Sequence, residues 1–166
     1  MTSNALLLSV KWAGPFAWEE VIQRFDDGGR SPSYAGPDYG LYQIYGNHIL
    51  SGPETLLYIG RATQQTFSAR FLGHRGWLEK EGPEILKVYL GRINDPARHS
   101  DDGCWATWVR DVEIAECLLI YKYSPNYNSM SIAEPPSLAP YQSVTIEHEG
   151  KRCRLSKKDV APDDWW

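Results

Sequence analysis

The chain has 166 residues and a formal net charge of −4, from 17 basic and 21 acidic side chains. This length suits one domain with extensions better than two domains. A content of 42% apolar and 13% aromatic residues excludes a largely disordered chain. The negative charge argues against a dedicated nucleic-acid-binding domain, which usually carries a basic surface.

The apolar segments give no sign of a membrane protein. The run at Leu6–Leu8 is too short for a signal peptide, and no stretch approaches the ~18 apolar residues of a membrane helix. The three cysteines, Cys104, Cys117 and Cys153, form no C-x-x-C pair, so neither a disulfide framework nor a zinc site is expected. We therefore expect a soluble, cytoplasmic protein with no membrane partner.

The first 38 residues predict a helix and a linker. Pro15 is followed by apolar residues at helical spacing, and Gly28-Gly29 ends the pattern, which predicts an amphipathic helix over residues 15–27. Glycine and proline are dense over residues 28–38, as in a loop. We therefore assign residues 1–38 to an N-terminal helical extension and linker.

Two runs near the middle of the chain predict a β-hairpin. The segments YGLYQIYG, residues 39–46, and TLLYIG, residues 55–60, are rich in residues that favour strands. Gly52-Pro53 between them marks a turn. The two strands are therefore expected to pair as neighbours.

The hairpin is followed by a predicted helix, strand and helix, over residues 66–80, 84–93 and 111–123. The first helix carries Phe67 and Phe71 at i, i+4, and Ser124-Pro125 stops the second. The order hairpin, helix, strand, helix predicts an α/β (α+β) fold, a small three-stranded antiparallel sheet flanked by helices, with N- and C-terminal extensions.

The last part of the chain is predicted to wrap around this core. Residues 129–140 are rich in proline, and a short strand is expected at Ser143–His148. We assign residues 129–166 to a C-terminal wrapping segment and tail. The segment KRCRLSKK supplies candidate nucleic-acid contacts, although a solvated charged tail explains it equally well: Lys151, Arg152, Arg154, Lys157 and Lys158.

Arg70 and His74 are candidates for a site because of their spacing. On a helix they lie on one face, about 6 Å apart along the axis. An arginine beside a cleft can hold a phosphate or carboxylate in a bidentate contact, and a histidine can transfer a proton near neutral pH. The alternative is a solvated helix edge with a basic residue in each turn.

Glu116 is unusual because apolar residues surround it in IAECLLIY. A buried carboxylate loses hydration and needs a compensating partner. That partner is either a metal ion or an arginine such as Arg61 or Arg70, and the spacing does not decide between them.

Tyr42 and Tyr58 occupy corresponding places in the two hairpin strands, each beside a glycine. A tyrosine on a strand usually serves packing. Together with a buried carboxylate, arginines and a histidine, however, two phenols suffice for phosphoryl transfer to water.

These residues together resemble the GIY-YIG nuclease family. The resemblance rests on GLY at residues 40–42, YIG at residues 58–60 and the closing SPNYN at residues 124–128, with Arg70, His74 and Glu116 in between. It covers residues 39–128, which would form the catalytic domain.

The resemblance implies roles for the tyrosines and for Glu116. Either Tyr42 or Tyr58 would help activate the attacking water, since family members differ on this point. Glu116 would bind one divalent ion, Mg²⁺ or Mn²⁺, as its single protein ligand.

The resemblance also implies roles for the remaining site residues. Arg70 would hold the scissile phosphate, His74 would assist proton transfer or phosphate binding, and Asn128 would order the site by hydrogen bonds. Arg61 stands where several members have lysine. An arginine can polarise a tyrosine but cannot act as a base.

The resulting expectation is a metal-dependent endonuclease that hydrolyses phosphodiester bonds in DNA. Because the chain is acidic, added contacts would come from its flanks, a homodimer or a protein partner, or the substrate would be branched or single-stranded. The alternatives are a catalytically silent module of the same fold that binds nucleic acid or protein, and a hydrolase of another phosphate ester.

Overall fold

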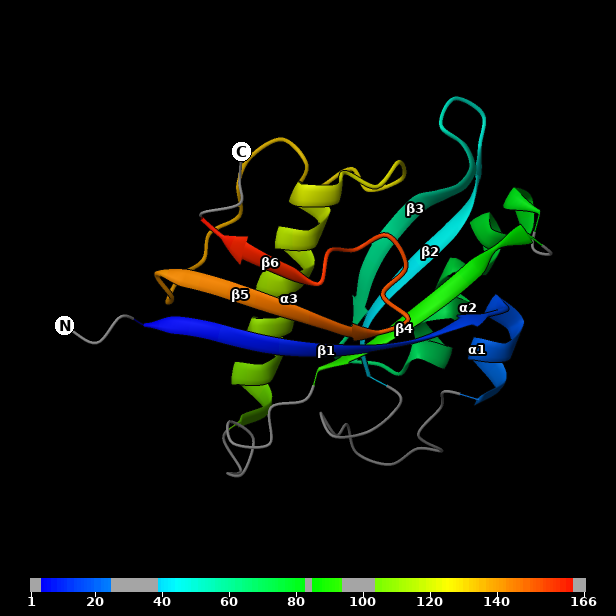
Figure 1. Ribbon diagram of the computed structural model, residues 1–166. Helices are drawn as coiled ribbons and strands as arrows, with labels where there is room; N and C mark the ends of the chain where they lie inside the picture. The colour runs from blue at the N-terminus through cyan, green and yellow to red at the C-terminus, as the bar shows by residue number, and fades with distance from the viewer. Residues whose placement is uncertain (1–3, 25–38, 83–84, 94–103, 163–166) are drawn as a thin grey trace.

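The computed structural model describes residues 4–24, 39–82, 85–93 and 104–162. A six-stranded mixed sheet with the strand order β3-β2-β4-β1-β5-β6 bends into a half-barrel (Figure 1). The strands are β1 (Ala5–Phe16), β2 (Gly40–His48), β3 (Gly52–Ala62), β4 (Lys87–Ile93), β5 (Ser143–Gly150) and β6 (Lys158–Ala161). The helices are α1 (Trp18–Arg24), α2 (Phe67–Leu78) and α3 (Cys104–Tyr123), with a 3-10 turn at Glu79–Glu81.

The predicted three-stranded sheet is wrong in size, although the class remains α+β. The three expected strands, β2, β3 and β4, are present and antiparallel. Beyond them β1 pairs antiparallel with β4 and parallel with β5, and β6 completes the sheet. The segments assigned to extensions thus supply three strands, because a free β4 edge would leave a row of backbone groups unpaired.

The strand β1 has a clear period of two. Leu6, Leu8, Val10 and Trp12 are buried, while the residues between them are exposed or half-buried. Alternation of this kind is typical of a strand with one face on the core. The predicted helix over residues 15–27 accordingly starts later, at Trp18, because residues up to Phe16 belong to β1. Residues 25–27 lie outside the described ranges.

The other predicted elements are confirmed with shifted ends. The hairpin strands are longer than expected, and residues 49–51 make the turn instead of Gly52-Pro53. The helix α2 begins after Thr66, whose Oγ1 accepts a hydrogen bond from the amide of Ala69 at 3.2 Å. The helix α3 begins at Cys104 rather than at residue 111, because buried Trp108 extends its apolar stripe towards the N-terminus.

The sheet separates two hydrophobic cores. One core joins α3, through residues such as Trp108 and Leu118, to one face of the sheet. The other joins α1 and α2 to the opposite face of β2, β3 and β4. Phe67 and Phe71 of α2 are fully buried in this second core, and each contributes about 1.5–3 kcal/mol through burial. These two anchors hold Arg70, which lies between them in sequence, at the margin of the helix.

A buried polar network joins β1, β5, β6 and α3. Asp159, which is fully buried, accepts hydrogen bonds from Lys122 Nζ at 2.8 Å and from the Tyr123 hydroxyl at 3.0 Å. Trp12 Nε1 donates to His148 Nδ1 at 2.9 Å, so Nε2 of His148 carries the proton and donates to Asp159 at 3.0 Å. The network compensates the desolvation of the carboxylate.

Each helix in the described ranges is too short or too polar to cross a membrane.

Candidate active site

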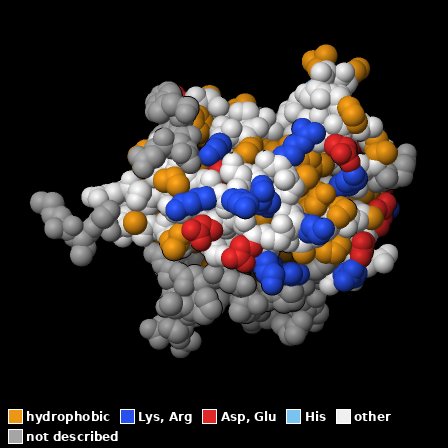
Figure 2. Space-filling view, in the orientation of Figure 1, with side chains coloured by type: hydrophobic (Ala, Val, Ile, Leu, Met, Phe, Trp, Pro, Cys, Tyr) orange, Lys and Arg blue, Asp and Glu red, His pale blue; other side chains and the backbone are white. Residues whose placement is uncertain are grey.

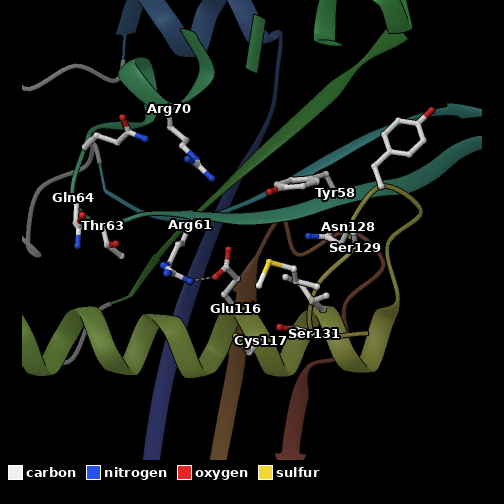
Figure 3. Close-up of a pocket in the computed structure, with 14 residues that line it drawn as sticks. Tyr58, Arg61, Thr63, Gln64, Arg70, Glu116, Cys117, Asn128, Ser129 and Ser131 are labelled. Carbon is white, nitrogen blue, oxygen red and sulfur yellow. Dashed lines mark hydrogen bonds and ion pairs between the residues drawn. The ribbon is translucent and has the colours of Figure 1, made fainter. Parts of the chain in front are cut away.

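A cavity of about 440 Å³ lies at the outer edge of β3. Residues of β3, α2, α3 and the segment after α3 line it (Figure 3): Tyr58, Arg61, Thr63, Gln64, Gln65, Arg70, Glu116, Cys117, Ile120, Tyr127, Asn128, Ser129, Met130 and Ser131. Tyr58 packs with the α2 core, whereas Ile59 belongs to the α3 core. At this edge the side chains of both faces of the sheet reach one cavity.

The convergence of opposite faces is visible in Figure 3. Arg70 points into the cavity from one side of β3, and Arg61 and Glu116 lie on the other side. Successive side chains of a strand point to opposite faces, so Tyr58 and Arg61 are separated by the plane of the sheet. Only the edge strand of a sheet permits such an arrangement, because an inner strand has neighbours on both sides.

Tyr42 is held by two side chains of α2. Its hydroxyl lies 2.8 Å from Nε2 of His74 and accepts a hydrogen bond from Nε of Arg70 at 3.3 Å. Trp77 Nε1, which can only donate, lies 3.2 Å from Nδ1 of His74. The proton of neutral His74 is therefore on Nε2, and Nε2 donates to the Tyr42 oxygen.

Burial keeps this network in its neutral forms. Burial, together with the nearby Tyr58, raises the pKa of Tyr42 far above its ordinary value of 10.0. Burial, followed by the charge of Arg70, lowers the pKa of His74 to about 4. His74 is thus a neutral donor near pH 7, and Arg70 is the cation of the network.

The two tyrosines differ in access to the cavity. Tyr42 is fully buried, whereas Tyr58 is half-buried and forms part of the cavity wall. The rings stack, with centroids 6.0 Å apart. The structure therefore brings both candidates together, but only Tyr58 reaches the cavity.

Steric packing requires a glycine at position 60, in the YIG segment. Gly60 is the register partner of Tyr42 across the hairpin. A Cβ at this position would lie 2.4 Å from both Cζ and the hydroxyl oxygen of Tyr42. The Tyr42 ring therefore occupies the space that any other residue at position 60 would need.

Glu116 has an arginine partner in the structure. Arg61 forms ion pairs with Oε2 of Glu116 and with Glu113, one turn earlier on α3. Burial nevertheless raises the pKa of Glu116, and Arg61 opposes this shift. Of the partners that the sequence allowed, Arg61 makes the direct contact. Arg70, rather than Arg61, makes the contact with a tyrosine hydroxyl.

Glu116 also fits a divalent ion. Its side chain is only 12% exposed yet forms part of the cavity wall, and a cation there would favour the ionised carboxylate. Among the described residues no cluster of three or more His, Cys, Asp and Glu side chains could hold a metal. A site of one carboxylate completed by water and phosphate oxygens is typical of Mg²⁺.

Asn128 fastens the segment after α3 to the edge of β3. Its Oδ1 accepts from the amide of Ile59 at 3.0 Å, and its Nδ2 donates to the carbonyl of Ile59 at 2.9 Å. The amide of Tyr127 donates to the carbonyl of Leu57 at 2.8 Å. This segment pairs with the strand edge and forms one wall of the cavity.

The basic stretch after β5 lies elsewhere. None of its five residues is among the described residues that line the cavity. Arg152 donates to the carbonyl of Leu155, and Lys158 lies 4.0 Å from Glu147. Figure 2 shows a face of the molecule on which basic side chains gather, with acidic side chains among them. The structure therefore does not join Lys151, Arg152, Arg154, Lys157 and Lys158 to the site.

Three further residues contribute to this site. Glu113 shares Arg61 with Glu116, and its position three residues earlier was the available signal. Trp77 fixes the tautomer of His74 and also lies three residues away from it. Tyr127 lines the cavity, and its place in SPNYN beside Asn128 was the available signal.

No protein-family model, curated protein or solved structure matches this chain.

Proposed function

We propose that this chain is a metal-dependent endonuclease that hydrolyses phosphodiester bonds in DNA, as a member of the GIY-YIG nuclease family. The observation that carries the proposal is the cavity at the β3 edge. It brings Tyr58 and Arg70 from one face of the sheet together with Glu116 from the other. A phenol, a guanidinium and a carboxylate around one cavity can orient a water, hold a phosphate and bind a divalent cation.

Arg70 would bind the scissile phosphate. Its Nε is engaged by Tyr42, so the guanidinium is fixed while its terminal nitrogens remain directed at the cavity. The guanidinium stays charged at every physiological pH and would stabilise the extra negative charge of the transition state. Tyr42 and His74 would act as positioning residues, because neither lines the cavity.

Tyr58 would contact the attacking water. Its hydroxyl can accept a hydrogen bond from the water and orient it towards phosphorus. As the bond from the water oxygen to phosphorus forms, the bond to the leaving oxygen breaks, and the proton that the water loses passes to bulk solvent. Glu116 would hold the divalent ion, which when bound stabilises charge on the phosphate and lowers the pKa of water. Burial disfavours phenolate at Tyr42, which supports Tyr58 in the direct role.

A cleavage panel tests the proposal. Purified protein with Mg²⁺ or Mn²⁺ is incubated with supercoiled, linear, branched and single-stranded DNA. We expect cleavage that Glu116→Ala and Arg70→Ala abolish, since positioned catalytic groups contribute ~10²–10⁴-fold in rate. Arg75→Ala is the matched control, because Arg75 lies on the same helix, is exposed and pairs with Glu79. If the wild-type protein leaves all four substrates intact, the proposed endonuclease activity is refuted.

The ion pair between Arg61 and Glu116 favours a second candidate, a catalytically silent module that binds nucleic acid or protein. The guanidinium already neutralises the carboxylate that a metal would need. Titration calorimetry with Mn²⁺ separates the two candidates. Uptake by the wild type that is lost in Glu116→Ala supports the nuclease, and no uptake by the wild type supports the silent module.

A further inference from the structure

The turn between β2 and β3 carries two bulky apolar side chains at its tip. Ile49 is 96% exposed and Leu50 is 89% exposed. The hairpin projects from the body of the molecule, and apolar side chains lie at the end of the projection (Figures 1 and 2). Hydrophobic side chains this exposed, and adjacent in sequence, are typical of an interaction site.

The tip is held in a fixed shape. Nδ1 of His48 lies 3.4 Å from the amide of Leu50 and 3.3 Å from that of Ser51. Asn126, in the segment that walls the cavity, donates to the hydroxyl of Ser51 at 2.9 Å. The turn that carries the two apolar side chains is therefore stabilised by hydrogen bonds, one of which joins it to the segment that lines the cavity.

A row of aromatic rings leads from the tip to the cavity. The ring centroids of His48 and Tyr127 are 5.8 Å apart, those of Tyr127 and Trp77 are 5.8 Å apart, and those of Trp77 and Tyr58 are 6.1 Å apart. All four rings are at least partly exposed, and Tyr58 and Tyr127 also line the cavity. The row thus connects the apolar tip to the candidate site.

We propose that the β2–β3 tip is a wedge that inserts between bases where duplex DNA meets a single strand, and that the released bases stack on Tyr127 and Trp77. Apolar side chains inserted between base steps unstack a duplex, and aromatic rings bind unpaired bases. The inference rests on the proposed function, since it gives that site a substrate class, a branched or flapped junction.

Base stacking, rather than charge, would hold unpaired nucleobases on this surface. With a net charge of −4, the chain has little general attraction for the phosphates of a duplex. Stacking on aromatic rings contributes to binding at every base. The row ends at the cavity that contains Arg70, so a strand laid along it would bring a backbone phosphate to that guanidinium.

The test measures binding and opening of a junction without cleavage. A fork of duplex and single strand carries 2-aminopurine at the first base pair, in the strand opposite to the one that is released onto the rings, and wild-type protein is added in EDTA. We expect an increase in 2-aminopurine fluorescence and binding to the fork at least about tenfold tighter than to blunt duplex. The double variant Ile49→Ser/Leu50→Ser should lose the increase in fluorescence and most of the preference for the fork.

Leu7→Ser is the control, because Leu7 is also an exposed apolar residue, at 56%, but lies on β1. Equal binding to fork and duplex, or an unchanged signal in the double variant, overturns the wedge. Absence of any DNA binding also overturns it and points to a protein partner for the tip. Binding to the fork without cleavage in Mn²⁺ would refute the proposed nuclease activity but not the wedge. Cleavage of the fork that Ile49→Ser/Leu50→Ser leaves unchanged would refute the wedge but not the nuclease activity.

Discussion

His74 donates a hydrogen bond from Nε2 to the Tyr42 hydroxyl at 2.8 Å, and its unprotonated Nδ1 accepts one from Trp77 Nε1 at 3.2 Å. The lowered pKa of His74, about 4, keeps it in this form. Protonation at Nδ1 would break the contact with Trp77, since neither group could then accept. The network that positions Arg70 is therefore sensitive to acid.

This arrangement predicts a pH dependence of stability. The unfolded chain binds the proton of His74 near pH 6.5 and the folded chain only near pH 4. Between these values the unfolded state holds more protons, so the free energy of unfolding falls as the pH falls through this window. His74→Gln, which keeps a donor for Tyr42, should show a smaller loss between pH 6.5 and 4 in urea unfolding.

His48→Gln serves as the control for removal of a histidine outside this network. Equal pH dependence of the free energy of unfolding in wild type and His74→Gln would refute the assignment of a neutral His74.

Gly60→Ala should destabilise the protein. The new Cβ would lie 2.4 Å from the Tyr42 ring, and overpacking of a core costs about 1–3 kcal/mol. Chemical denaturation measures the change. Gly73→Ala is the matched control, because a Cβ there has open space on α2, and alanine in a helix is favoured over glycine by about 0.5–1 kcal/mol. The prediction fails if both substitutions shift stability in the same direction.

Arg61→Gln should have opposite effects on stability and on metal binding. Without its partner, the largely buried carboxylate of Glu116 is left uncompensated, and the metal-free protein should lose about 1–3 kcal/mol. The same change removes the cation that competes with a divalent ion, so calorimetry should show tighter binding of Mn²⁺. The pKa of Glu116, already raised by burial, should rise further in the absence of metal.

Lys87→Gln is the control, since it breaks an exposed ion pair with Glu54 and should change neither property appreciably. Weaker Mn²⁺ binding by Arg61→Gln would show instead that Arg61 supports the metal site.

The sequence predicted the elements whose signals are local. The hairpin and α2 were predicted because their signals, the strand-favouring runs and the pair Phe67 and Phe71, each lie within a few residues of chain. The alternation of Leu6, Leu8, Val10 and Trp12 was a local signal for β1 that the prediction did not use. The parallel pairing of β1 with β5, in contrast, joins residues such as Leu6 and Val144, which are far apart in sequence. Patterns within one segment do not specify such a pairing.

The candidate site was predictable in composition but not in arrangement. The apolar neighbours of Glu116 in the sequence predicted that it needs a partner. They did not indicate whether that partner is Arg61 or Arg70, because this depends on how α3 packs against β3. The different exposure of Tyr42 and Tyr58 likewise follows from the edge position of β3 and the packing of α2. Both relationships arise only once the sheet and helices are assembled.

Asn128 should stabilise the protein through its two hydrogen bonds to the edge of β3. In Asn128→Ala, the amide and carbonyl of Ile59 lose both hydrogen bonds to the side chain, which should cost about 1–3 kcal/mol. In Asn128→Asp, a carboxylate can still accept from the Ile59 amide but is placed against the Ile59 carbonyl, so this near-isosteric change should also destabilise the protein. Hydrogen exchange of the Ile59 amide should accelerate more in Asn128→Ala than in Asn128→Asp. Ser129→Ala, an exposed neighbour in the same segment, should leave exchange unchanged, and equal protection in all three variants would show that Asn128 does not hold this edge.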